Sequence, residues 1–500
     1  MILFSMTKSH AQNKQDYYWP FAFSLDFREP SPGLEINFND RPVMPEIRNR
    51  GLSFNQNNAS ICDKDGNLLF YTNGCAVANR NHEIMPNGEG INESIHFQEF
   101  WGGDCARGYP GPQNITILED PNNERGYYII HKIFSYSLTA PAEDQFNIDS
   151  IKFSYVDMSL DNGYGDVVEK NINFYQDNEF PSNYLTSIAQ SNGVDWWIIN
   201  PVFPQGYLIF SLDEEGIKYD SIHPGPIWNP RKTSAAGHAR FSPDGTKYAL
   251  FNQFDGLYIY DFDRSDGTLS NEQHLPWEDP GDYDSVFATC EWSPNSRYLY
   301  LSEVTDLWQL DTEAEALEDG LVYIAEWQGG ADRLQPSFGI AALGPDCRIY
   351  IRGKSSANSM HIIHKPDEPG LACDFVEQGI RLPATTSAGS FPNFPRFRVD
   401  EEDKCDPSIV SIVGETVWWR RDLTAYPSPA SEYVTVELPE DTGGLLYMLD
   451  MQGQIVLRQS DARSQQRLDI SGLPPGIYSI EFMPEQNEER VVYTRRVMVE

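Results

Sequence analysis

Three kinds of residue in this sequence could do chemistry: a close histidine pair, glycine-flanked serines and runs of aspartate. His361 and His364 are spaced like metal ligands, but residues three apart on a β-strand point to opposite faces, so we do not expect the two imidazoles to share a metal. No Gly-x-Ser-x-Gly or His-Glu-x-x-His motif occurs, and Ser387 and Ser390 fit a turn better than a nucleophile elbow. The sequence therefore predicts no catalytic residue and no metal site.

Two aspartate runs carry oxygen ligands of the kind that Ca²⁺ prefers. The first run comprises Asp63, Asp65 and Asn67, and the second lies at residues 261–266. Neither run ends in the distal glutamate that completes a calcium loop, and Asp and Asn recur in turns because they cap their own backbone. Turns are the favoured interpretation, no cofactor is predicted, and Ca²⁺ is kept as the alternative.

A repeat of 51 residues organises the chain and must position any site. The turn Ser-Pro-Asp-Gly at 242–245 recurs as Ser-Pro-Asn-Ser at 293–296 and as Gly-Pro-Asp-Cys at 344–347. Apolar residues precede each turn and an alternating strand follows it, which is the pattern of a short antiparallel sheet. Such units in series are typical of β-propeller blades. The repeated turn residues are Asp65 and Gly66 in an earlier unit, and then Pro243, Asp244, Gly245, Pro294, Asn295, Pro345 and Asp346.

Three less regular units precede these copies, and a segment at 360–397 closes the series. The predicted fold class is therefore all-β, with a seven-bladed β-propeller over residues 17–400 and six or eight blades as alternatives. Ring closure commonly pairs the first strand with the last blade, so the strand near Leu25 and Phe27 is expected to complete the sheet that begins near residue 390.

The bulk composition excludes some classes of function. The chain has 74 Asp and Glu against 37 Lys and Arg, a formal charge of −37, which repels the phosphate backbone of nucleic acids. A large solvated surface kept soluble by like charge explains this excess better than an acidic binding face. No apolar run reaches the roughly 18 residues that a transmembrane helix needs. We therefore expect no nucleic-acid partner and no transmembrane segment.

The cysteines and the N-terminus bear on the compartment. The seven cysteines form no Cys-x-x-Cys pair, and Cys347 and Cys373 flank one blade as a candidate disulfide, with buried free thiols as the equal alternative. Residues 1–12 contain a short apolar stretch followed by Ser9-x-Ala11, the small-x-small pattern of signal-peptidase sites. We expect these residues to be the remnant of a signal peptide, with an ordinary N-terminus as the alternative.

A second domain is predicted after a charged linker at 401–425. Six or seven short alternating strands follow in residues 426–500, which is typical of a small Ig-like β-sandwich.

Four motifs follow one another in this domain: Tyr-Pro-Ser-Pro-Ala at 426–430, Asp-Met-Gln-Gly at 450–453, Leu-Pro-Pro-Gly-Ile-Tyr at 473–478 and a closing Arg-Arg-Val-Met-Val-Glu at 495–500. In these motifs the domain resembles the type A C-terminal sorting domain of the type IX secretion system. Ser428 stands where the family usually has Asn, and Arg495 and Arg496 stand where Lys is more usual. The motif residues are Tyr426, Pro427, Pro429, Asp450, Gly453, Leu473, Gly476, Tyr478, Arg495, Arg496, Val497 and Val499.

The resemblance implies that the domain directs a folded cargo from the periplasm through the outer membrane, so that the protein is secreted or held at the cell surface. The type IX machinery is then a partner, and the route requires a signal peptide. Two stretches, at 65–74 and 261–270, also look like blades of uncharacterised surface propellers that travel with this domain. That likeness implies no activity.

Two functions of the propeller are left open by the sequence. It is predicted to be a binding or structural module for a glycan or protein ligand, and the 26 Tyr, 27 Phe and 11 Trp are enough to include a sugar-stacking face. The alternative is a carbohydrate-active enzyme or peptidase whose site, at the mouth of the central channel, has no linear motif. Carboxylates converging at that mouth, or a carboxylate with a histidine, would favour the enzyme.

Overall fold

The computed structural model describes most of the chain and divides it into two compact units. The described residues are 13–23, 33–40, 43–54, 56–93, 105, 108–136, 146–176, 179–228, 237–277, 288–327, 337–353, 355–387, 389–409, 419–438, 443–449, 455–462, 464–484 and 491–500. The first unit comprises Met1–Asn39, Pro45–Gln378 and Ala384–Ile409, and the second comprises Asp40–Met44, Gly379–Pro383 and Val410–Glu500. Residues 1–12, with the predicted signal-peptide remnant, lie outside the described part.

Seven sheets make up the described part of the first unit, and each is a run of consecutive strands. From the inner to the outer strand they are β1 (Tyr18–Phe21), β2 (Gly33–Asn37) and β3 (Pro45–Arg48); β4 (Ala59–Cys62), β5 (Leu68–Thr72) and β6 (Val77–Asn79); β7 (Ile115–Asp120), β8 (Asn123–Tyr136), β9 (Phe146–Asp157) and β10 (Asp166–Tyr175); β11 (Thr186–Ala189), β12 (Trp196–Pro201), β13 (Gln205–Asp213) and β14 (Gly216–Ile227); β15 (Gly237–Phe241), β16 (Lys247–Asn252), β17 (Gly256–Asp263) and β18 (Thr268–Leu275); β19 (Ala288–Trp292), β20 (Tyr298–Glu303), β21 (Asp306–Asp311) and β22 (Leu321–Glu326); β23 (Ala341–Leu343), β24 (Ile349–Ile351), β25 (Ala357–Ile363) and β26 (Phe375–Thr386).

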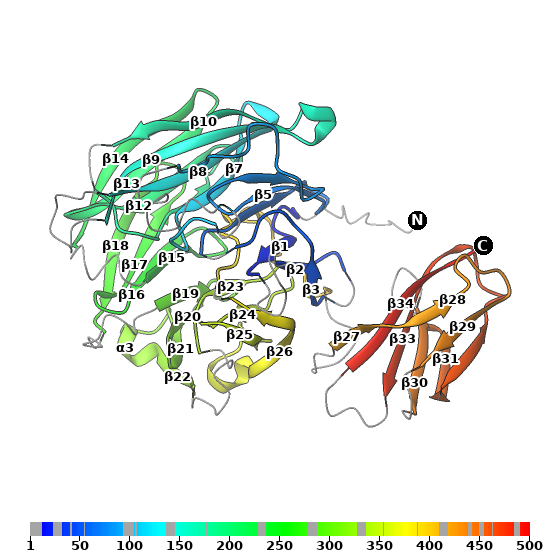
Figure 1. The fold of residues 1–500 in the computed structure, drawn as a ribbon. Helices are drawn as coiled ribbons and strands as arrows, with labels where there is room; N and C mark the ends of the chain where they lie inside the picture. The colour runs from blue at the N-terminus through cyan, green and yellow to red at the C-terminus, as the bar shows by residue number, and fades with distance from the viewer. Residues whose placement is uncertain are drawn as a thin grey trace, which may run out of the picture. The chain divides into compact units, whose positions relative to one another are not determined.

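The sheets stand around a common centre as the blades of a propeller, with β1, β15, β19 and β23 near the centre and β10, β14, β18 and β22 outside (Figure 1). The all-β propeller prediction is confirmed. The seven sheets agree with the predicted blade number, which remains a prediction for the complete ring.

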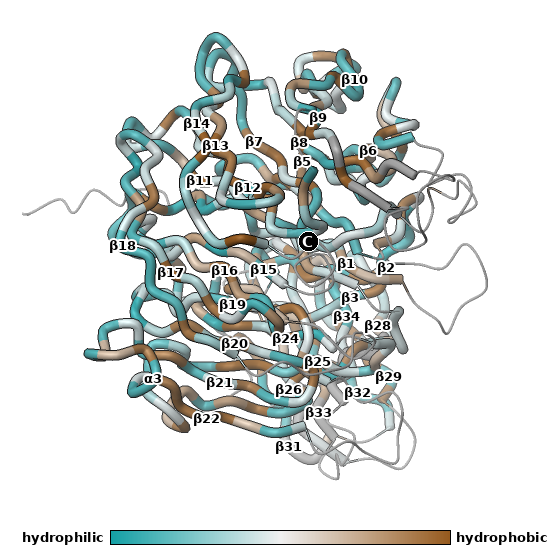
Figure 2. The backbone as a smooth tube through the Cα atoms, turned by 90° about the vertical axis from the view of Figure 1, so that its left-hand side faces the viewer, coloured by the Kyte–Doolittle hydropathy of each residue, from teal (hydrophilic) through white to brown (hydrophobic). Residues whose placement is uncertain are grey.

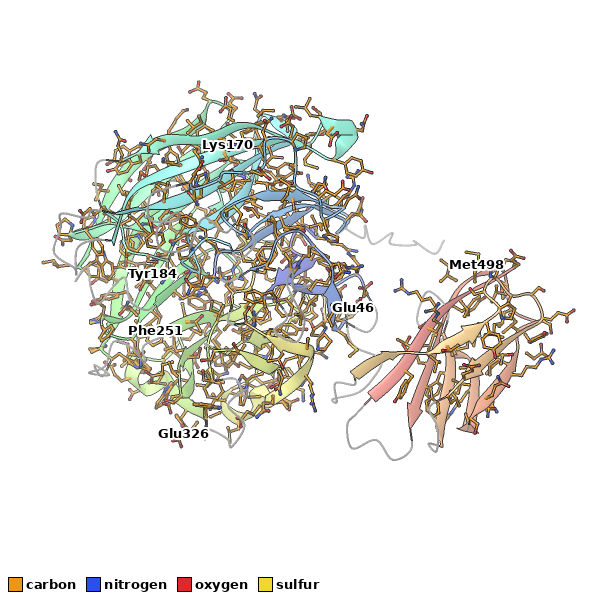
Figure 3. The ribbon with its side chains drawn as sticks, in the orientation of Figure 1. Glu46, Lys170, Tyr184, Phe251, Glu326 and Met498 are labelled. Atoms are coloured by element: carbon orange, nitrogen blue, oxygen red, sulfur yellow. A yellow bond between two sulfur atoms is a disulfide. The ribbon has the colours of Figure 1, made fainter. Side chains whose placement is uncertain are left out.

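Burial follows the position of each strand in its blade. An inner strand has sheets on both faces, and β15, β16 and β19 are buried along nearly all of their length, whereas the outer strand β18 is mostly exposed. In Figure 2, which is coloured by hydropathy, β18 is largely teal and therefore hydrophilic. Alternate residues of β16 pack on different neighbours: Tyr248 and Leu250 join a core with Tyr184, while Phe251 joins a core with residues of β20. Tyr184 and Phe251 lie inside the propeller in Figure 3.

An irregular strand-like segment, residues 389–398, closes the ring from the inside; we call it the central segment. It was predicted to be part of the closing blade. The structure places it beside β1, where the ring of Phe391 packs on Trp19 with centroids 5.0 Å apart, and it forms no regular ladder. Just before the segment, Ser387 N donates to Phe23 O (2.9 Å), and at its end Arg398 Nη1 donates to Asn13 O (2.9 Å). Pro392 and Pro395 carry no N–H, which is one reason why a regular ladder cannot form. The predicted closing strand at Leu25 and Phe27 lies outside the described residues.

Asn393 links the central segment to several blades. Its Nδ2 donates to Ile115 O (3.0 Å) and Leu185 O (2.9 Å), and its backbone N donates to Asn58 O (2.8 Å). Its Oδ1 accepts from Arg240 Nη1 (2.8 Å). One buried residue therefore satisfies polar groups beside four different inner strands.

The disulfides differ from the candidate pair. Cys347 is bonded to Cys405, with a Cα–Cα distance of 5.2 Å, while Cys75 is bonded to Cys105 and Cys373 is a buried free thiol. The predicted Cys347–Cys373 pair is wrong because the chain after the central segment returns to the 344–347 turn, where Asp406 N donates to Pro345 O (2.7 Å).

The second unit is a small β-sandwich. One sheet has the order β27 (Trp419–Asp422), β34 (Val491–Val499), β33 (Gly476–Pro484), β30 (Gly444–Leu449) and β31 (Ile455–Ala462), and the other has the order β28 (Thr424–Tyr426), β29 (Tyr433–Glu437) and β32 (Gln465–Asp469). Alternate side chains such as Val434 and Val436 of β29 and Ile480 and Phe482 of β33 form one buried core. The prediction of a sandwich is confirmed.

Replacing Asn393 with Ala should destabilise the propeller by about 3 kcal/mol, because buried donors and acceptors beside several blades would lose their partner. The measurement is chemical denaturation of the full chain, followed by tryptophan fluorescence. Asn122→Ala, in an exposed turn, is the control and should change stability by less than about 0.5 kcal/mol. Equal stability of the two variants would contradict the linking role of Asn393.

Candidate functional site

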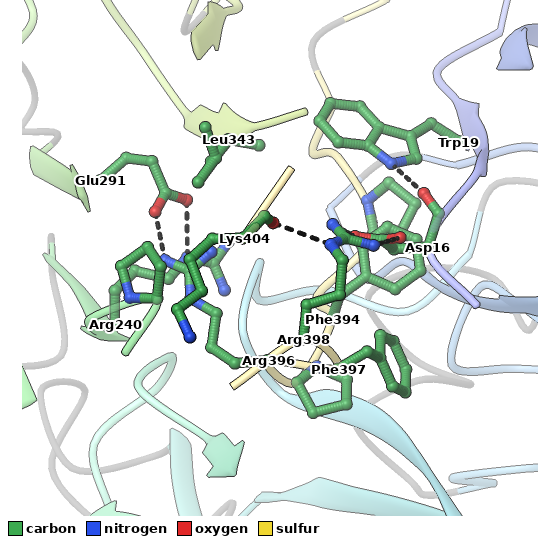
Figure 4. A pocket seen from close by; sticks show the side chains of 14 residues that line it. Asp16, Trp19, Arg240, Glu291, Leu343, Phe394, Arg396, Phe397, Arg398 and Lys404 are labelled. Carbon is green, nitrogen blue, oxygen red and sulfur yellow. Dashed lines mark hydrogen bonds and ion pairs between the residues drawn. The ribbon is translucent and has the colours of Figure 1, made fainter. Parts of the chain in front are cut away.

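A small pocket opens where the central segment emerges from the ring, and we call it the mouth pocket (Figure 4). Its volume is ≈ 40 Å³. Its charged residues come from different parts of the fold: Arg240 lies near the end of β15, Glu291 lies near the end of β19, Asp16 precedes β1, and Arg396, Arg398 and Lys404 lie in or after the central segment. Its apolar wall is formed by Trp19, Pro243, Leu343, Phe394, Pro395 and Phe397.

Both carboxylates of the mouth pocket are engaged in ion pairs. Glu291 lies between two guanidinium groups in Figure 4: Arg396 Nη2 donates to its Oε1, and Arg240 Nε lies 3.3 Å from its Oε2. Arg398 binds Asp16 through two contacts, of 2.6 and 2.5 Å. Among the described residues, no histidine lines this pocket. The two carboxylates of the mouth pocket are therefore paired with arginines.

Positive charge exceeds negative charge in the mouth pocket, with four cationic side chains against two carboxylates among its described residues. Burial lowers the pKa of the Arg240 guanidinium, and burial likewise lowers the pKa of the Lys404 ammonium. Lys404 Nζ donates to the carbonyls of Val399 and Glu401, each at 2.6 Å. Its positive charge is therefore partly stabilised by these two carbonyl dipoles. An arrangement of this kind can attract an anion.

The mouth pocket was not predicted from the sequence, although one signal was present. Arg240, Glu291 and Ala342 each stand three residues before the proline of a repeated turn, so they occupy one position of the 51-residue repeat. A charged residue near the end of a buried inner strand is unusual unless it is paired. The opposite charges at two consecutive copies could have indicated a contact between neighbouring blades.

The predicted blade-turn residues lie in the loops that follow the inner strands. Asp244 Oδ1 accepts from Ser242 Oγ (2.5 Å) and Thr246 N (3.0 Å), and Asn295 Oδ1 accepts from Ser293 Oγ (2.7 Å). Gly66 and Gly245 have positive φ, of 89° and 73°, which glycine adopts without strain. Pro243, Pro294 and Pro345 are buried and Asp65 is exposed. These residues shape hairpins.

Asp346 is buried, whereas Asp65, Asp244 and Asn295 at the corresponding turn positions are exposed or partly exposed. Its Oδ2 accepts from Tyr350 Oη (2.8 Å) and lies 3.8 Å from Arg348 Nη1. Burial raises the pKa of the Asp346 carboxyl to about 6. Part of the propeller's stability should therefore depend on the protonation of this group.

The other residues singled out in the sequence do not come together. His361 is buried in β25, where its Nδ1 accepts from Gln378 N (3.2 Å), and Ser390 Oγ donates to Gln56 O. Asp63 Oδ1 accepts from Asp65 N (3.0 Å) and Asn67 N (2.9 Å), the pattern of an aspartate that caps its own turn. Among the described residues no group of three or more His, Cys, Asp or Glu is placed to hold a metal ion.

A wider hollow of ≈ 1150 Å³ shares Phe397 with the mouth pocket. Among the described residues that line it, Lys64 is the single cationic side chain, whereas the carboxylates are Asp63, Asp65, Glu119, Asp120, Glu124, Asp400 and Glu401. The two neighbouring depressions thus carry opposite charge.

The sorting-motif residues lie mostly in the sandwich strands. Val497 and Val499 of β34 are buried, Tyr478 of β33 is buried and donates from its Oη to Pro474 O (2.8 Å), and Leu473 packs against the same core. Gly476 begins β33 and pairs with Val499. Tyr426, Pro427, Pro429, Arg495 and Arg496 are exposed, whereas Asp450 and Gly453 lie outside the described residues.

The fold defines an all-β protein with a propeller followed by a β-sandwich. Residues 424–500 match the family model of the secretion system C-terminal sorting domain. The chain therefore carries a sorting domain of the type IX secretion system, which implies export to the cell surface or secretion. No curated protein matches the sequence significantly. In the described part of the chain, no helix has the length and apolar character needed to span a bilayer.

Several solved structures are similar to this chain at low identity. A 6-phosphogluconolactonase-like protein from Bacteroides uniformis is 12% identical, with 74% of this chain and 97% of that chain covered and a TM-score of 0.45. The periplasmic gluconolactonase PpgL of Pseudomonas aeruginosa is 10% identical, with 74% and 98% covered and a TM-score of 0.43. PorZ, a surface component of the type IX secretion system of Porphyromonas gingivalis, is 10% identical, with 94% and 74% covered and a TM-score of 0.29. These TM-scores are too low to transfer a function to this chain.

Replacing Asp346 with Asn should change how the stability of the propeller depends on pH. A pKa raised in the folded state means that the group stabilises the fold below its ordinary value of 3.8 and that this stabilisation is lost as pH rises through about 6. The amide introduced by the substitution cannot ionise, so the stability of Asp346→Asn relative to the native chain should increase between pH 4 and pH 7.5, by on the order of 2 kcal/mol.

Denaturant titrations of the full chain at several pH values measure this difference. The matched control is Asp65→Asn, at the corresponding but exposed turn position. A difference between Asp346→Asn and the native chain that does not vary with pH would show that Asp346 does not titrate in this range.

Proposed function

We propose that this protein is a cargo of type IX secretion whose propeller acts, after export, as a binding module for a glycan or protein ligand. The proposal that the protein is a secretion cargo rests on the match of residues 424–500 to the sorting-domain family. The sandwich also has a core of its own, in which Val434, Leu446 and Val497 are fully or almost fully buried. A domain with its own core can fold independently and act as the secretion signal, while the other domain performs the function of the secreted protein.

The geometry of the mouth pocket favours binding over hydrolysis. A glycosidase needs two carboxyl groups free to act as acid and as base or nucleophile, and a peptidase needs an activated nucleophile or water. Asp16 and Glu291 are instead held by arginines, and no histidine stands beside them among the described lining residues. The central segment also occupies the inside of the ring, where its polar groups bond to the inner strands. The propeller therefore offers a rigid face that is suited to holding a ligand.

Deleting residues 426–500 should leave a folded propeller that is not exported beyond the periplasm of a host with the type IX system. The measurement is protease accessibility of the propeller on intact cells, compared with fractionated periplasm. The control variant is Tyr433→Phe, because Tyr433 is 37% exposed in β29 and lies outside the sorting motifs, so the change should leave the sandwich core and export unchanged. Surface display of the deletion variant at the native level would refute the sorting role.

A screen of the full chain against neutral and acidic glycans and against surface proteins should yield at least one ligand that raises the melting temperature of the propeller. A ligand that binds only the folded state must raise this temperature by mass action. The control is the chain with Asn393→Ala, whose propeller is expected to be weakened and should need more ligand to reach the same melting temperature. A screen with no stabilising ligand of either kind would contradict the binding function.

A further inference from the structure

The mouth pocket is positively charged in a protein that is strongly acidic. Four cationic side chains line it against two carboxylates among its described residues, while the whole chain has a formal charge of −37. Arg240 and Glu291 are almost completely buried, with side chains 8% and 2% exposed. Arg240 and Arg398 are buried together with Glu291 and Asp16, so the buried charges balance. The excess of positive charge belongs to Arg396 and Lys404, which are partly exposed and can be reached by a ligand from solvent.

One buried donor of the mouth pocket, on Arg240, makes no hydrogen bond among the described residues. Arg240 Nε is buried and makes no hydrogen bond, although it lies 3.3 Å from Glu291 Oε2. Arg396, which is partly exposed, uses its Nε for Phe241 O (2.9 Å) and its Nη2 for Glu291. Lys404 Nζ uses two of its three protons for backbone carbonyls. Donors of this kind are the usual partners of an oxyanion.

The size of the mouth pocket limits the anion that it can accept. One water-sized group needs about 10–15 Å³ of such volume, so ≈ 40 Å³ holds about three heavy atoms. A carboxylate has three heavy atoms and is planar, as a guanidinium is, whereas a phosphate has five. The apolar lining includes two prolines and one aromatic ring, namely Pro243, Pro395 and Phe394, which can pack against the apolar C–H groups of a small ligand.

We propose that the mouth pocket is a carboxylate subsite, in which Arg240, Arg396 and Lys404 receive the acidic end group of a ligand. This inference deepens the proposed binding function and rests on it. Two sources of the group share this chemistry, the uronic acid residue of a glycan and a free organic acid. Lys404 and Arg396 belong to the part of the chain that closes the ring, so a bound carboxylate would also hold that part to β15.

The test measures the melting temperature of the full chain in sodium glucuronate, sodium acetate and sodium chloride at equal ionic strength, with neutral glucose as a further arm. We expect glucuronate and acetate each to raise the melting temperature above the value in chloride. The rise should increase with the concentration of the anion relative to its Kd. A larger shift with glucuronate identifies an acidic sugar as the source, and equal shifts identify any small organic acid. Carboxylate shifts no larger than the chloride shift would overturn the proposal.

Lys404→Gln should weaken carboxylate binding at least tenfold, because it removes one of the cations that receive the group. The matched control is Lys247→Gln, which makes the same charge change in β16 of the blade that carries Arg240, at a side chain that does not line the pocket. Arg240→Lys is the second variant, since it keeps the charge but loses the orphan Nε donor, and it should also weaken binding. Native affinity in either folded variant would overturn the proposal.

The experiments distinguish a failure of the carboxylate subsite from a failure of the proposed binding function. If the screen of the full chain finds a neutral glycan or a protein ligand but glucuronate and acetate give no shift, the subsite is wrong and the binding function stands. If neither the screen nor the carboxylates stabilise the propeller, both are wrong.

Discussion

The propeller depends on the satisfaction of buried backbone groups by the central segment. Seven sheets that meet at a common centre leave inner strands whose polar groups at the centre are shielded from water, and such groups must find partners. Asn393 supplies partners to Ile115, Leu185 and Arg240, and Arg396 supplies one to Phe241. The segment thus holds the ring from within, and the Cys347–Cys405 disulfide ties the chain that follows it to the seventh sheet.

The mouth pocket is a consequence of this closure. Arg396 and Arg398 leave the centre of the ring at the end where the inner strands β15 and β19 also finish, so the charges of Arg396, Arg240 and Glu291 meet there, while Arg398 meets Asp16. The ion pairs neutralise Glu291 and Asp16, so the pocket keeps a net positive charge. The acid-lined hollow that contains Glu119 and Asp400 adjoins it and shares Phe397 with it. The sorting domain accounts for export. The two oppositely charged depressions lie on the propeller.

Much of the fold could be predicted because its determinants are local. Pro-Asp turns such as the one at Asp244 bond to their own backbone, and the alternation of β16 places Tyr248 and Phe251 on opposite faces whatever the rest of the chain does. The strands of the sandwich were predicted for the same reason. The central segment could not be predicted as a ring filler, because Phe391 and Phe394 are as apolar as a blade strand would be. The Cys347–Cys373 pair failed because distance along the chain is a poor guide to disulfide pairing.

By itself the sequence determined the all-β class, the repeated blades, the turn residues and the sorting domain, since each depends on spacing over a few residues or on a motif. Tertiary structure alone decided the partner of Cys347, the path of residues 389–398 and the mouth pocket. Asp16, Arg240, Glu291 and Lys404 are up to 388 positions apart along the chain, and their charges interact only after the ring has closed. Electrostatic interaction depends on distance in space and on burial, and neither is encoded in local sequence patterns.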